Sequence, residues 1–101
     1  MIKLEATCDA QGGLVAFTVR NHGSSHVCAA VSLLVLNTVN AVEALTDAQF
    51  TCDHDPKGGY INFALQSARD TTIGREAGLL LDAMMLGLTS VKEQYPQDFE
   101  Y

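Results

Sequence analysis

The feature of this sequence that most constrains its fold is a change in the spacing of apolar residues after residue 20. Residues 2–6 alternate apolar and polar side chains, which is the period of a half-buried strand, and residues 14–20 predict a second strand with Val15, Phe17 and Val19 on one face. The turn-forming residues 9–13 lie between them, so the two stretches are predicted to form an antiparallel hairpin. After a polar break, apolar residues recur at helical spacing from Val27 to about Leu45, which predicts a helix.

The second half of the chain has the same order of elements. A strand around Phe50, a turn at residues 56–59 and a strand over 60–65 precede a long helix over about 73–95. Pro96 ends that helix because proline and the residue before it disfavour helical continuation.

These segments predict one α+β domain that spans residues 1–101. The expected order is β-β-α-β-β-α, with two helices packed on one face of a mostly antiparallel sheet. Nearly half of the residues (48%) are apolar, which suffices for a core without disulfide or metal cross-links.

Charge and targeting signals narrow the functional class. The formal net charge is −6 and the six Lys and Arg residues are scattered, so no direct contact with nucleic acid is expected and a basic polypeptide is the favoured partner.

The alternating residues 2–5 follow Met1 directly, so no signal peptide is predicted. The apolar stretches 27–36 and 77–88 are interrupted and too short to span a bilayer, so no membrane association is expected. Three cysteines form no paired pattern, which favours a reducing cytoplasm.

The second predicted helix is apolar almost all round, more than a helix with one buried stripe requires. Two interpretations remain open: the helix is wedged into the core, or its outer face contacts a second copy in a homodimer. The residues concerned are Leu79, Leu80, Leu81, Met84, Met85, Leu86 and Leu88.

The residues with catalytic potential lie at the start of the first helix. If Ser24 or Ser25 caps this helix, Cys28 lies in its first turn, where free backbone N–H groups and the helix dipole stabilise a thiolate. His22 lies in the preceding loop, where an imidazole can act as the base of a cysteine nucleophile. Ser32 is one turn beyond Cys28 on the same face.

Two plainer interpretations remain beside this one. A cysteine in an apolar helix is often a small buried side chain, and a loop histidine is often a solvated surface residue. His26 is a rival base, but two residues along a helix it points to a different face from Cys28.

The run Val-Cys-Ala-Ala-Val-Ser at residues 27–32, after His22-Gly23, resembles the signature of the ribosomal-processing cysteine protease family. The likeness covers essentially the whole chain and includes Gly59-Tyr60 and Tyr95-Pro96. It differs in the flanks of His22, in a loop of only five residues before Cys28, and in Ser25, where many members carry an acidic residue.

The resemblance implies a homodimeric α+β cysteine endopeptidase that needs no metal or organic cofactor. Its substrate would be large-subunit ribosomal protein twenty-seven, a basic protein that loses a short N-terminal extension during ribosome biogenesis. Carried over to this chain, Cys28 is the nucleophile, His22 is the general base, and Ser32 is a supporting or substrate-binding residue. The alternative is a non-catalytic, ribosome-associated binding or scaffold protein that kept the fold.

Other polar clusters rank lower. Cys52 and His54 share one face of a predicted strand, but two ligands are too few for a closed metal site. Cys8 at a strand end is interpreted as a packing residue. The acidic and aromatic residues 93–101 are interpreted as a solvated end that could help to hold a basic substrate.

Overall fold

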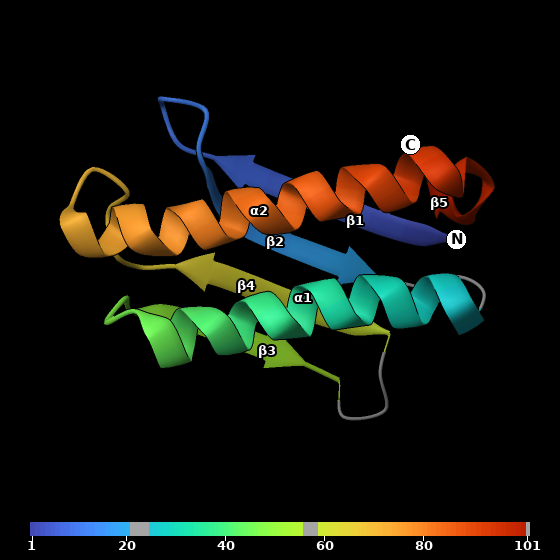
Figure 1. Ribbon diagram of the computed structural model, residues 1–101, viewed down its shortest axis with the longest axis horizontal. Helices are drawn as coiled ribbons and strands as arrows, with labels where there is room; N and C mark the ends of the chain where they lie inside the picture. Colours follow the sequence, from blue (N-terminus) through green and yellow to red (C-terminus); the bar gives the residue numbers. More distant parts are fainter. Residues whose placement is uncertain (21–24, 56–58, 101) are drawn as a thin grey trace.

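The computed structural model describes residues 1–20, 25–55 and 59–100 of the chain. Two helices lie side by side in front of a five-stranded sheet (Figure 1), so the molecule has two layers. The elements in chain order are β1 (Ile2–Cys8), β2 (Leu14–Arg20), α1 (Ser25–Leu45), β3 (Phe50–His54), β4 (Tyr60–Leu65), α2 (Thr72–Gln94), the 3₁₀ helix η1 (Pro96–Asp98) and β5 (Phe99–Glu100).

The sheet has the strand order β3-β4-β2-β1-β5. All neighbours are antiparallel except β1 and β5, which are parallel. This confirms the predicted α+β class, the element order and the placement of both helices on one face. The sequence prediction lacked the two short elements after α2, the 3₁₀ helix η1 and the terminal strand β5.

The end of the chain corrects the interpretation of residues 93–101 as a solvated end. Phe99 is 2% exposed and its backbone pairs in register with Ile2, which is fully buried. The residues after α2 are therefore not simply a solvated end, because a large aromatic side chain completes the core beside β1. Glu100 of the same strand is exposed.

The β1–β2 hairpin depends on its turn. One carboxylate oxygen of Asp9 accepts hydrogen bonds from the backbone N–H groups of Gln11 (3.1 Å) and Gly13 (2.8 Å). Gly12 has a φ of 85°, a conformation that a residue with a Cβ rarely adopts. The turn thereby fixes the register in which Lys3 faces Arg20.

The core lies between the sheet and the helices. α1 contributes a valine stripe at helical spacing, and β2 and β4 contribute alternating side chains from one face. Phe63 stacks on both Phe17 and Phe50, with ring centroids 5.2 Å apart in each pair. The buried valines of α1 are Val27, Val31, Val35, Val39 and Val42.

Helix α2 buries one side and exposes another. Thr71 caps its start, because its hydroxyl oxygen accepts a hydrogen bond from the Gly74 N–H at 3.0 Å. Leu81 is fully buried, whereas Leu79 and Leu86 are 71% and 73% exposed. The interpretation that α2 is wedged into the core on all sides is therefore wrong, and these two leucines lie on an outer face.

The length of α1 corrects the expectation that its apolar stretch is too short to span a bilayer. The helix runs for 21 residues, and its window His26–Leu45 has a mean hydropathy of 1.7, so by length and composition it could cross a membrane. Core helices of globular proteins meet the same criterion. Here the valine stripe of α1 packs into the core beneath it.

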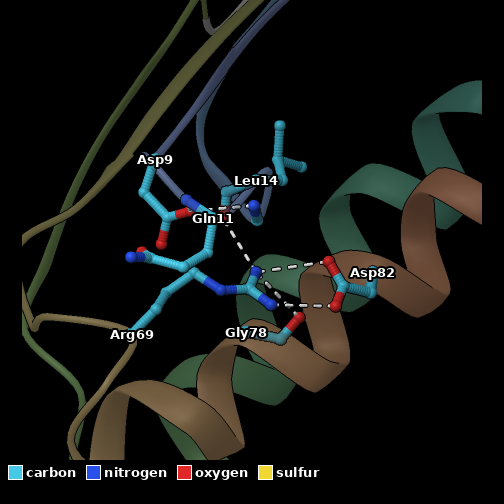
Figure 2. A network of polar contacts seen from close by, with 7 residues as sticks. Asp9, Gln11, Leu14, Arg69, Gly78 and Asp82 are labelled. Carbon is cyan, nitrogen blue, oxygen red and sulfur yellow. Dashed lines mark hydrogen bonds and ion pairs between the residues drawn. The ribbon is translucent and has the colours of Figure 1, made fainter.

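A partly buried arginine, Arg69, joins the start of β2 to α2 (Figure 2). The Arg69 guanidinium forms a bidentate ion pair with Asp82, with Nη2–Oδ2 and Nη1–Oδ1 distances of 2.8 and 3.2 Å. Its Nη1 also lies 2.9 Å from the Leu14 carbonyl and 3.2 Å from the Gly78 carbonyl. The Arg69 side chain is only 16% exposed, and its hydrogen bond to Asp82 raises the pKa of its guanidinium. Arg69 therefore connects β2, the loop before α2 and α2 itself.

Candidate active site

Cys28 lies in the first turn of α1. The helix begins at Ser25, so the capping position falls on residue 24, which lies outside the described residues. Backbone N–H groups in this first turn have no acceptor within the helix. Cys28 is half-buried, with Val27 beside it fully buried in the core. The thiol therefore lies at the surface of the helix on a turn that the core holds.

Ser32 lies one turn beyond Cys28, as the spacing predicted. The two side chains are on the same face, with Sγ and Oγ 3.9 Å apart, within the range of a weak sulfur hydrogen bond. A hydroxyl in this position can donate to a thiolate or accept from a thiol. The structure thus brings together two of the three residues that the sequence analysis selected.

His22 lies outside the described residues, so its distance from Cys28 stays a prediction. The elements on either side of it are described: β2 ends at Arg20 and α1 begins at Ser25. Figure 1 shows the end of β2, the start of α1 and the end of α2 at the same end of the molecule. The segment that carries His22 connects two elements of this end.

His26 has a contact that the sequence analysis missed. Its ring meets the ring of Tyr95, at the end of α2, edge to face, with centroids 5.3 Å apart and planes at 74°. The two residues are far apart in the sequence, and no local pattern signals their pairing. Antiparallel packing of the two helices brings them together (Figure 1).

The other two cysteines lie on strands, Cys8 on β1 and Cys52 on β3, whereas Cys28 lies on a helix. Burial, and secondly the charge of Asp53, raise the pKa of the Cys52 thiol, which packs at the edge of the core. Cys8 is exposed, so its interpretation as a packing residue is wrong. The reason is that the inner face of β1 is covered only near its start, where Ile2 is buried.

Metal ligands are not gathered in the part of the chain that the structure describes. Within residues 1–20, 25–55 and 59–100, no group of three or more His, Cys, Asp or Glu side chains could hold a metal ion. Cys52 and His54 of β3 form no such group there.

A thiol at the start of a helix, with two helices packed on a five-stranded sheet, is the arrangement with which known proteins were compared. Residues 1–100 match the family model described as "Cysteine protease Prp". The chain belongs to the cysteine protease Prp family. This confirms the resemblance found in the sequence, and with it the assignment as a cysteine endopeptidase.

Curated proteins of the Prp family are similar to this chain over most of its length. The ribosomal processing cysteine protease Prp of Bacillus subtilis is 32% identical over 74 residues, which cover 73% of this chain and 66% of that protein. The protein of the same name from Staphylococcus aureus strain Mu50 is 28% identical over 104 residues, which cover 97% of this chain and 94% of that protein.

Solved structures with the same fold include one of a Prp protein. The S. aureus protease Prp in complex with a covalently linked product peptide has a TM-score of 0.87 and 27% identity, covering 99% of this chain and 96% of that one. SMU.848 from Streptococcus mutans has a TM-score of 0.82 and 30% identity, covering 99% of this chain and 94% of that one. The fold described above is therefore the Prp fold throughout.

Proposed function

We propose that this Prp family member removes a short N-terminal extension from a basic large-subunit ribosomal protein, ribosomal protein twenty-seven, with Cys28 as nucleophile and His22 as base. The observation that carries the proposal is the place of Cys28 in the first turn of α1, with the Ser32 hydroxyl beside it. The relatives are named ribosomal processing proteases, and the S. aureus enzyme holds a covalently linked product peptide.

The reaction follows from these groups. The Cys28 thiolate attacks the scissile carbonyl carbon, and the carbonyl oxygen takes up the negative charge. N–H groups at the start of α1 stabilise this oxyanion, since they have no helical acceptor and lie at the positive end of the helix dipole. His22 gives its proton to the departing amine, which leaves a thioester on Cys28.

The second half of the reaction releases the enzyme. His22, now neutral, takes a proton from water, and the resulting hydroxide attacks the thioester carbonyl. Collapse of that intermediate expels the Cys28 sulfur and yields the carboxylic acid of the extension. Ser32, 3.9 Å from Sγ, supports the sulfur or the substrate by hydrogen bonding. Neither step requires a metal or an organic cofactor.

The charge of the chain supports a basic substrate. A net charge of −6 attracts a cationic polypeptide and raises its rate of encounter. The same charge disfavours direct binding to the phosphates of RNA. We place this encounter in the cytoplasm and not at a membrane.

The outer face of α2 supports a homodimer. Leu79 and Leu86 are seven residues apart, which places them on one side of the helix, and both are more than two-thirds exposed. On α1, Leu33 is 71% exposed. Burial of such leucines against a second copy is favourable by about 25 cal/mol for each Å² of apolar surface removed from water.

The test compares three proteins on the purified ribosomal protein with its extension, with cleavage followed by mass spectrometry. The wild type should remove the extension. Cys28→Ala should bind the substrate and leave it intact, and His22→Ala should lose about 10²–10⁴-fold in turnover. If the wild type binds the extended protein without cutting it, the chain is instead a binding or scaffold protein.

A further inference from the structure

The contact between His26 and Tyr95 joins the start of one helix to the end of the other. The ring centroids are 5.3 Å apart and the planes meet at 74°, the edge-to-face arrangement that aromatic pairs prefer. His26 is the second residue of α1, and Cys28 follows two residues later in the same turn. The contact therefore acts on the turn that carries the nucleophile.

Tyr95 is held in place by its own backbone. Its N–H donates to the Val91 carbonyl at 2.9 Å, and its carbonyl accepts from the Asp98 N–H at 3.1 Å. Pro96 follows it, and Phe99 anchors the next residues in the core. The Tyr95 ring thus projects from a fixed point at the end of α2.

The first turn of α1 is held to the core mainly on one side. Val27 is fully buried, whereas His26 is exposed and its ring meets Tyr95 at the end of α2. The valine stripe fixes the helix as a whole, but helix ends fray, so a second contact in the first turn limits the motion of that turn. The Tyr95 ring supplies that second contact.

We propose that the His26–Tyr95 pair is a positioning contact that sets the orientation of the Cys28 sulfur. The proposal rests on the proposed function, since it assumes that Cys28 is the nucleophile. His26 acts through the shape of its ring and transfers no proton. A misplacement of a reacting atom by about 1 Å can cost roughly 100-fold in rate, so a contact of this kind affects turnover without touching the substrate.

The variants separate ring shape from proton transfer. His26→Ala and Tyr95→Leu remove the contact, and each should lower kcat by about 10- to 100-fold while KM stays the same. His26→Phe and Tyr95→Phe keep a ring at each position and should keep kcat. Met85→Ala is the control for packing, because Met85 is a half-buried residue of α2 that packs against the core ten residues before Tyr95.

A second readout needs no substrate. The rate at which iodoacetamide alkylates Cys28, located by peptide mapping, should fall in His26→Ala and Tyr95→Leu and stay unchanged in Met85→Ala. Thermal unfolding of every variant verifies that it is folded. His26 is exposed, so His26→Ala leaves the core intact even if Tyr95→Leu does not fold.

Three results would overturn the proposal. A kcat in His26→Ala no lower than in Met85→Ala would show that the contact does not position the thiol. A His26→Phe variant as inactive as His26→Ala would make His26 a base. An effect confined to KM would make the pair a substrate contact.

Failure of the proposed function gives a different result. If Cys28→Ala still cleaves, Cys28 is not the nucleophile, and kcat no longer tests the contact. The alkylation rate of Cys28 then shows by itself whether the contact positions the thiol.

Discussion

Gly78→Ala should destabilise the protein, although alanine ordinarily strengthens a helix. A Cβ built at Gly78 lies 2.5 Å from Cζ and 2.8 Å from Nε of Arg69, closer than real Cβ atoms approach. The guanidinium must therefore leave its place between Leu14 and Asp82 (Figure 2). The substitution tests whether Arg69 joins the first hairpin to α2.

The magnitude follows from the bonds that are lost. A hydrogen bond to a charged group is worth about 1.5–3 kcal/mol, and Arg69 makes its shortest carbonyl bond, 2.9 Å, to Leu14. The ion pair with Asp82 adds only about 0.2–1 kcal/mol, because that carboxylate is half exposed to solvent. Alanine recovers about 1 kcal/mol of helix propensity. The net loss is about 1–3 kcal/mol of unfolding free energy.

The assay is urea unfolding followed by circular dichroism. Gly87→Ala is the matched control in the same helix, because its added Cβ meets mainly a terminal methyl of Leu34, which can shift. In an Arg69→Ala background the sign should reverse, and Gly78→Ala should stabilise by about 1 kcal/mol. If Gly78→Ala destabilises equally with and without Arg69, the arginine is not the cause.

Three further predictions concern the core, the thiols and assembly. Phe99→Ala should cost about 3–5 kcal/mol in urea unfolding because the ring is buried, and a cost below 1 kcal/mol would show that β5 is peripheral. Burial and Asp53 raise the pKa of Cys52, so iodoacetamide should label it at higher pH in the folded than in the unfolded protein. The free energy of unfolding should fall as the pH rises from the unfolded pKa of this thiol to its folded pKa, and identical labelling profiles would refute this. Leu86→Asp should split the proposed dimer in light scattering while the equally exposed Leu45→Asp leaves it intact, and a monomeric wild type at micromolar concentration would contradict the claim.

Local sequence patterns predicted the regular elements well. β2 and β4 have the bounds predicted, since alternating apolar residues are flanked there by turn residues. α2 ends just before Pro96, as the restriction on the residue before proline requires. Within the candidate site, the helical spacing of four residues was enough to place Ser32 beside Cys28.

Contacts between distant segments could not be predicted in this way. β5 has two residues, too few for any periodic signal, and it forms only because β1 offers an open edge. Arg69 bonds to Leu14, far before it in the sequence, and to Gly78, after it. The guanidinium has room there because Gly13 and Gly78 lack side chains. The His26–Tyr95 contact likewise depends on how two helices pack.

The central claim, that Cys28 is the nucleophile, is tested most directly by trapping its thioester. The wild type is mixed with a peptide that spans the junction between the extension and the mature ribosomal protein, and the reaction is stopped with acid for intact-mass and peptide-mapping mass spectrometry. We expect an added mass equal to the extension peptide less one water, located on Cys28 and absent from Cys28→Ala. Cleavage by Cys28→Ala, or an adduct on Cys8 or Cys52 instead, would contradict it.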